Sequence, residues 1–109
     1  MKSLKLVLMP LLLTFSLIGC GDKGVSFDGQ DEKSFLQSMK LVEQSISEQP
    51  ETKKAYNEAM EAIYFKATMQ LYHLKASEFD ARIRAALDGK TAQDVIDDQN
   101  DIFVHIVNG

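Results

Sequence analysis

The sequence predicts a small all-α domain, a bundle of three or four helices in residues 31–109. Apolar residues recur along this stretch at the three- and four-residue spacings of amphipathic helices. Pro50 and Gly89 stand where such helices begin and end. The 109 residues, 45% hydrophobic and 26% charged, have the length and composition of one ordinary folded domain.

Two helices are expected before residue 77. Asp31 is a suitable N-cap for the first helix. Pro50 opens the second, expected over residues 50–76, because proline is tolerated in a first helical turn. The first helix has one apolar face, made of Phe35, Met39, Val42 and Ile46. The second has an apolar stripe, made of Tyr56, Met60, Ile63, Tyr64, Ala67, Leu71 and Leu74.

The rest of the chain predicts one or two further helices. Ser77 and Asp80 have the spacing of a capping box, so a third helix is expected to begin there. No residue in 75–78 forces a break, so one continuous helix over 50–87 stays open. Gly89 is expected to end the third helix, because glycine accepts the positive φ of a helix C′ position. Thr91 and Asp94 then have the spacing of a cap for a last helix.

These later helices are also amphipathic. The third has an apolar line of Phe79, Ile83 and Leu87. The last is expected to bury Val95, Ile96, Ile102, Phe103 and Ile106, and to carry Asp94, Asp97, Asp98 and Asp101 on its other side. The β-branched run 102–107 could pair as a strand, but the chain offers it no second strand. We therefore expect a helix there.

The first twenty residues have the pattern of an export signal. Lys2 and Lys5 precede 13 uncharged residues, a run too short to span a membrane and of the right length for a signal-peptide core. The run ends in Leu17-Ile18-Gly19-Cys20, which resembles the lipobox of bacterial lipoproteins. The resemblance implies that residues 1–19 are a signal peptide, cut between Gly19 and Cys20.

In that family the lipobox cysteine carries the membrane anchor. The resemblance therefore implies a diacylglycerol thioether on Cys20 and, in many species, an acyl chain on its new amine. Two or three lipid chains on one residue hold a protein permanently at a membrane. The implied location faces the periplasm or cell exterior. In a diderm the outer membrane is favoured, because Gly21 and not an aspartate follows the cysteine.

Residues 20–30 are glycine-rich and predict a short tether, with Phe27 docked on the body near its end. The segment Phe27-Asp28-Gly29, the helix after it, and Leu87-Asp88-Gly89-Lys90-Thr91-Ala92 with Val95-Ile96 resemble a family of small bacterial lipoproteins of unknown function. That resemblance covers most of residues 20–109 and implies a location and a fold. It implies no activity.

Composition and motifs exclude several function classes. The single cysteine permits no internal disulfide and no cysteine-based zinc site. The net charge of −4 argues against nucleic acid as a partner, because phosphate binding needs clustered Lys and Arg. Asp101 and His105 could face each other on a helix, but no third metal ligand accompanies them, so no metal site is expected. No catalytic motif or phosphate-binding loop occurs, and we expect no enzyme and no cofactor besides the lipid.

Phe65, Met69 and Tyr72 lie opposite the main stripe of the second helix. Burial under other helices is the interpretation we favour, and the alternative is a surface for self-association or for a partner. The function expected is a membrane-anchored interaction or structural module that meets an unknown envelope protein. The second hypothesis is a hydrophobic-ligand or lipid-binding protein, with a cavity between helices lined by Phe65, Met69, Tyr72 and Phe79.

Overall fold

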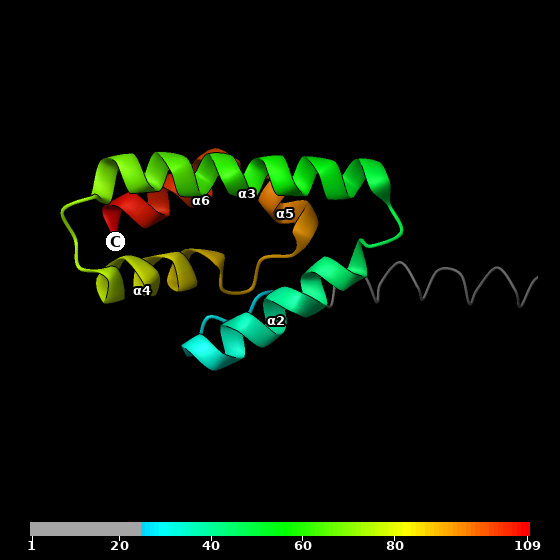
Figure 1. Cartoon of the computed structure of the whole chain (residues 1–109), viewed down its shortest axis with the longest axis horizontal. Coiled ribbons are helices and arrows are strands. Elements are labelled where there is room, and N and C mark those ends of the chain that lie inside the picture. The colour runs from blue at the N-terminus through cyan, green and yellow to red at the C-terminus, as the bar shows by residue number, and fades with distance from the viewer. Residues whose placement is uncertain (1–24) are drawn as a thin grey trace, which may run out of the picture.

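The computed structural model describes residues 25–109, which form five α-helices and no strand. The helices are α2 (Glu32–Ser45), α3 (Pro50–Leu71), α4 (Ala76–Leu87), α5 (Ala92–Asp97) and α6 (Gln99–Asn108). α6 packs against both α3 and α4, and α5 packs against α3. Figure 1 shows α3 along one side of the domain, with α2 and α4 on the other side. The predicted all-α bundle is confirmed for this part of the chain.

The predicted start of α2 is confirmed. The carboxylate of Asp31 accepts a hydrogen bond from the backbone N–H of Ser34 at 2.8 Å. This backbone bond, together with a bond from the Ser34 side-chain hydroxyl, lowers the pKa of Asp31 below its usual 3.8. Pro50 is the first residue of α3, as its fixed φ predicts.

α3 ends at Leu71, five residues before the predicted limit of residue 76. Tyr72 keeps helical angles, after which the chain turns and Lys75 takes an extended conformation. Leu74 still packs against the core from within this turn. Apolar periodicity therefore continued past the last helical residue and could not mark the end of the helix. The segment 50–87 is two helices, not one.

α4 begins at Ala76, one residue before the predicted start, and the capping box at Ser77 is wrong. Lys75 occupies the N-cap position and no side chain caps the helix. Asp80 instead accepts a hydrogen bond at 3.2 Å from the guanidinium of Arg84, one turn later. Residues four apart on a helix lie side by side on its surface, so Arg84 binds the Asp80 carboxylate. That carboxylate is then not available to cap the helix start.

The predicted last helix is divided into α5 and α6 by Asp98, whose φ of −112° and ψ of 30° are not helical. No glycine or proline marks this break. Residues 97–100 read Asp-Asp-Gln-Asn. Asp and Asn side chains compete with the backbone for hydrogen bonds and so form helices poorly. The cap of α5 is as predicted: the hydroxyl of Thr91 accepts from the N–H of Asp94 at 3.1 Å, and the Asp94 carboxylate accepts from the N–H of Thr91 at 3.0 Å.

The core runs through all five helices and includes one residue from the segment before them. Its buried apolar residues are Phe27, Phe35, Val42, Ile46, Tyr56, Ala59, Ile63, Ala67, Leu71, Ile83, Ala86, Leu87, Ala92, Val95, Ile102 and Ile106. Met39, Met60, Tyr64, Leu74, Phe79, Ile96 and Phe103 are partly buried against it. The predicted apolar faces therefore do form the core.

Candidate functional site

The segment Phe27–Gly29 is bonded into the domain, and we call it the clasp. The backbone N–H of Phe27 donates to the carbonyl of Lys90 at 2.9 Å, and the N–H of Gly89 donates to the carbonyl of Phe27 at 2.8 Å. The N–H of Gly29 donates to the Asp88 carboxylate at 2.9 Å. The two turn motifs, 59 residues apart in sequence, therefore hold each other in space.

Side chains complete the clasp on its other flank. The Phe27 ring is buried and stacks on Phe35 of α2, with 5.4 Å between the ring centroids. The N–H of Asp28 donates to the buried Ser38 hydroxyl at 2.8 Å. The Arg84 guanidinium donates to the carbonyl of Gly29 at 3.3 Å. Phe27 docks on the body as predicted, and the ordered domain begins before residue 31.

Glycine is required at two positions of this junction for different reasons. A Cβ on Gly29 would overlap the backbone carbonyl oxygen of Arg84, so the close approach of two backbones excludes a side chain. Gly89 has open space around it, but its φ of 81° is the left-handed conformation predicted for the end of α4.

The clasp fixes where the chain leaves the domain toward Cys20. Cys20, Gly19 and the lipobox lie outside the described residues. Five residue steps separate Cys20 from Val25, and an extended chain covers at most about 3.6 Å per residue, or about 18 Å in all. A lipid on Cys20 would therefore keep the clasp face of the domain close to the membrane.

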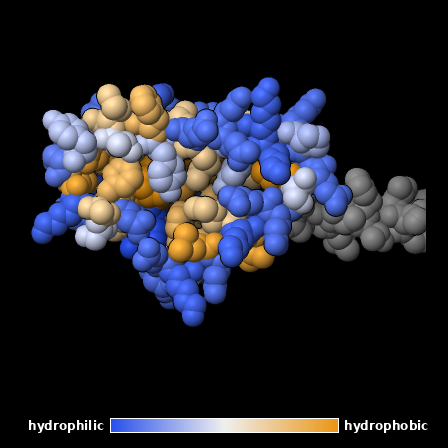
Figure 2. Space-filling model, in the orientation of Figure 1, coloured by the Kyte–Doolittle hydropathy of each residue, from blue (hydrophilic) through white to orange (hydrophobic). Residues whose placement is uncertain are grey.

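The second candidate site is the outer face of α3. Phe65, Met69 and Tyr72 are 67%, 61% and 81% exposed. The favoured expectation, that other helices bury them, is wrong: α5 and α6 pack on the opposite face of α3, where Ala59, Ile63 and Ala67 are buried. Figure 2 shows apolar side chains at the surface toward the end of the domain where α3 stops and α4 begins. Leu36 and Leu41 of α2 are also exposed.

These residues do not enclose a cavity. Tyr72 and Phe79 border one open hollow of about 200 Å³, and Phe65 and Met69 take no part in it. A separate shallow depression lies on the outside of α3, lined by Glu58, Glu61, Ala62 and Phe65. Small-molecule sites are enclosed pockets, whereas these side chains form an open apolar row. The arrangement therefore suits a large partner better than a small ligand.

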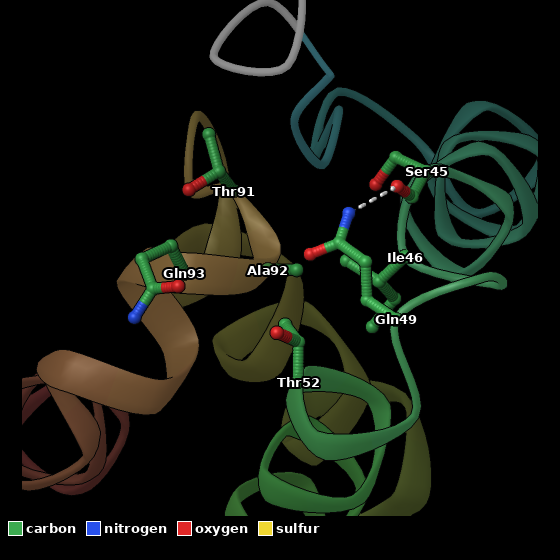
Figure 3. A pocket seen from close by; sticks show the side chains of 7 residues that line it. All are labelled: Ser45, Ile46, Gln49, Thr52, Thr91, Ala92 and Gln93. Carbon is green, nitrogen blue, oxygen red and sulfur yellow. Dashed lines mark hydrogen bonds between the residues drawn. The ribbon is translucent and has the colours of Figure 1, made fainter. Parts of the chain in front are cut away.

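A small polar hollow of about 140 Å³ lies where α2, α3 and α5 meet (Figure 3). Its lining side chains carry amides, hydroxyls and methyl groups, from Ser45, Ile46, Gln49, Thr52, Thr91, Ala92 and Gln93. The side-chain amide of Gln49 crosses part of it and donates to the Ser45 carbonyl at 3.4 Å. None of these side chains titrates, so the hollow provides hydrogen bonds without an acid or a base.

A larger open groove of about 400 Å³ runs between α2 and α3, beside Tyr56 and three charged groups, Lys40, Glu43 and Lys53. The Tyr56 hydroxyl is buried without a hydrogen-bond partner among the described residues. Burial, and secondarily the charge of Glu43, raises the pKa of Tyr56 far above its ordinary value. Burial also raises the pKa of Tyr64. Both phenols therefore remain protonated and neutral at physiological pH.

The acidic side chains of α5 and α6 do not form one charged face. Asp94 caps α5 and Asp98 interrupts the helix, and both are partly buried, whereas Asp97 and Asp101 are exposed. Within residues 25–109, no three His, Cys, Asp or Glu side chains are grouped closely enough to hold a metal ion. None of the helices in that part of the chain is long and apolar enough to cross a membrane.

The comparison with protein families gives one match. A family model described as a family of unknown function (DUF6694) matches residues 5–103. The chain belongs to this family. The match runs from residue 5, within the predicted signal segment, to the middle of α6, and so covers most of the helical domain. No curated protein and no solved structure matches the chain.

Sequence reasoning missed two arginines that hold the domain together. Arg82 of α4 donates to the carbonyls of Ile106 and Val107 at 3.1 and 2.8 Å, and so binds the C-terminal end of α6. Arg84 bonds the clasp. Both lie on the polar side of an amphipathic helix, and periodicity alone does not distinguish such residues from solvated ones.

Proposed function

We propose that this chain is a lipid-anchored protein of the bacterial cell envelope whose helical domain is a protein-interaction module. Diacylglycerol on Cys20 holds the domain at the membrane, facing the periplasm, at the outer membrane if the source is a diderm. The outer face of α3 meets the partner. The exposure of Phe65, Met69 and Tyr72 carries the proposal, because a soluble domain seldom leaves three large apolar side chains together in water without a use for them.

The clasp supports the same proposal. It fixes the chain's exit from the domain within about 18 Å of Cys20, so the anchor limits how far the domain can move from the membrane. A module that meets a partner at the membrane gains from this restriction, because less freedom is then lost on binding.

Metabolic labelling tests the anchor. Cells that express the full chain are grown with an isotope-labelled fatty acid, and the purified protein is examined for label. We expect label in the natural chain and in a Ser26→Ala control, and none in Cys20→Ala, which should accumulate as the longer precursor. Label that persists in Cys20→Ala would refute the anchor.

Photo-crosslinking in intact cells tests the interaction face. A photo-reactive phenylalanine analogue is placed at Phe65 on the exposed row or at Gln70, which is exposed on another side of the same helix. We expect adducts from position 65 and few from position 70. Equal yields from the two positions would show that α3 has no preferred contact face.

A further inference from the structure

The outer face of α3 has the pattern of a short coiled-coil seam. Ala62, Phe65, Met69 and Tyr72 follow one another at spacings of 3, 4 and 3, which are the a and d positions of a heptad. The seam lies opposite the buried face of the helix, and within residues 25–109 its three large side chains, Phe65, Met69 and Tyr72, are left exposed. We propose that the seam binds the same seam of a second copy, with the two α3 helices parallel and in register. This inference rests on the proposed function and names its partner.

Charge at the edges of the seam favours a parallel pair. With Ala62 at position a, Glu61 is the g residue of the preceding heptad. Lys66 is the e residue of the heptad that begins at Ala62. In a parallel two-stranded coil, such g and e residues of opposite chains face each other and form ion pairs. Both side chains are exposed, and a twofold axis repeats the Glu61–Lys66 contact on each side. Antiparallel helices would set g against g and e against e, and this contact would be lost.

The shape of the face agrees with this packing. The shallow depression bounded by Glu58, Glu61, Ala62 and Phe65 consists of residues i, i+3, i+4 and i+7. Four residues at this spacing form the hole that receives an a-position side chain of the facing helix. Glu58 stands at the d position before Ala62, where two copies would bring like charges together. The apolar part of the contact is therefore confined to residues 62–72, with Glu58 at its edge.

The area available predicts a weak pair in solution. An aromatic side chain buries about 150 to 250 Å², so the exposed parts of Phe65, Met69 and Tyr72 offer on the order of 400 Å² per copy. Two copies reach about half of the roughly 1,600 Å² of a standard stable interface. Anchoring both copies in one membrane raises their local concentration and compensates for a small interface.

The anchors are compatible with this symmetry. A twofold axis parallel to α3 leaves the two copies of Val25 at the same level along that axis. Both tethers can then end in one membrane. A pair with antiparallel α3 helices would separate the two clasps along the helix axis by twice their offset from the centre of the pair.

Disulfide trapping in membranes tests the pair. Met69→Cys is introduced into the full chain, membranes are isolated and oxidised mildly, and the fraction migrating at twice the monomer mass is measured. Gln70→Cys on the same helix is the matched control. The natural chain, whose only cysteine is Cys20, gives the background. We expect a strong dimer band from Met69→Cys and background from the other two.

Two further variants in the Met69→Cys chain separate a specific pair from random collision. Phe65→Asp should reduce the dimer band about tenfold, the scale of losing a buried anchor residue. Glu61→Lys and Lys66→Glu should each reduce it about threefold, the scale of an exposed ion pair lost or reversed. Together they should restore it. Restoration is specific to a Glu61–Lys66 contact between copies and would not follow from a general change in charge.

The contradicting results are distinct. Equal bands from Met69→Cys and Gln70→Cys, or a double reversal that stays low, would overturn the pairing. Stronger trapping between Phe65→Cys and Tyr72→Cys chains than between two Phe65→Cys chains would indicate an antiparallel pair and would also overturn it. Adducts of other masses at Met69 would replace the second copy by a different protein and leave the proposed function standing. Failure of fatty-acid labelling at Cys20, in contrast, would remove the anchor on which that function depends.

Discussion

Adding one methyl group at Gly29 should destabilise the domain more than adding one at Gly89, although only Gly89 has a positive φ. A Cβ at Gly29 would overlap the Arg84 carbonyl oxygen and stand 3.0 Å from the Cβ of Asp88. The overlapping carbonyl belongs to the backbone of α4 and cannot rotate aside, so the clasp itself must move away. The Gly29 N–H would then lose its bond to the Asp88 carboxylate. A Cβ at Gly89 meets nothing within 4 Å.

The two costs can be estimated separately. A hydrogen bond to a charged group contributes about 1.5–3 kcal/mol, and overpacking costs about 1–3 kcal/mol. Relaxation relieves part of the overpacking but lengthens the hydrogen bond, so the two costs add in part and Gly29→Ala should destabilise the domain by about 2–4 kcal/mol. Gly89→Ala should cost about 1 kcal/mol, from the left-handed backbone alone. Since 1 kcal/mol shifts the melting temperature of a domain of this size by about 4–8 °C, the two variants should differ by at least 4 °C or so.

Thermal unfolding of residues 21–109, followed by the far-ultraviolet circular dichroism of the helices, measures both variants. Lys90→Ala is the control, because Lys90 binds the clasp through its backbone carbonyl and not its side chain. It should melt like the natural sequence. If Gly29→Ala melts no lower than Gly89→Ala, the contact between the clasp and α4 does not contribute to stability as argued.

Three further predictions concern helix ends. Thr91→Ala should cost about 1 kcal/mol by removing the cap of α5, whereas Thr91→Ser should restore most of it; equal melting of all three proteins would contradict the capping box. Because the pKa of Asp31 is lowered on folding, its contribution to stability should be present above pH 3.8 and be lost as the pH falls below that value. Urea unfolding of Asp31→Asn should show a weaker dependence on pH in this range than the natural sequence, and an unchanged dependence would contradict the assignment. Arg82→Ala should cost about 1–2 kcal/mol by freeing the terminal carbonyls of α6, and faster amide exchange at residues 105–109 should accompany the loss; unchanged exchange there would contradict it.

The helix starts and stops that could be predicted from the sequence are those set by local chemistry. Asp31, Pro50, Gly89 and Thr91 act on their own turns, and each is found in its predicted role. The end of α3 could not be predicted in this way. Leu74 continues the apolar period but packs on the core from a turn, because burial and helical conformation are separate requirements.

The candidate site depends on contacts between distant segments. The motifs around Gly29 and Gly89 were visible in the sequence, but their pairing required knowing that the chain returns α4 to the clasp. For Phe65, Met69 and Tyr72, periodicity established a shared face and left its surroundings undecided. A domain of this size leaves a large share of its surface exposed, and the helices available cover only one side of α3.

Mass spectrometry of the N-terminus tests the central claim most directly. The full chain is purified from bacterial membranes, and its N-terminal peptide is sequenced with its modification intact. We expect a peptide that begins at Cys20 and carries a diacylglycerol on its sulfur. A mature chain that still contains residues 1–19, or one that begins at another residue with a free Cys20 thiol, would contradict it.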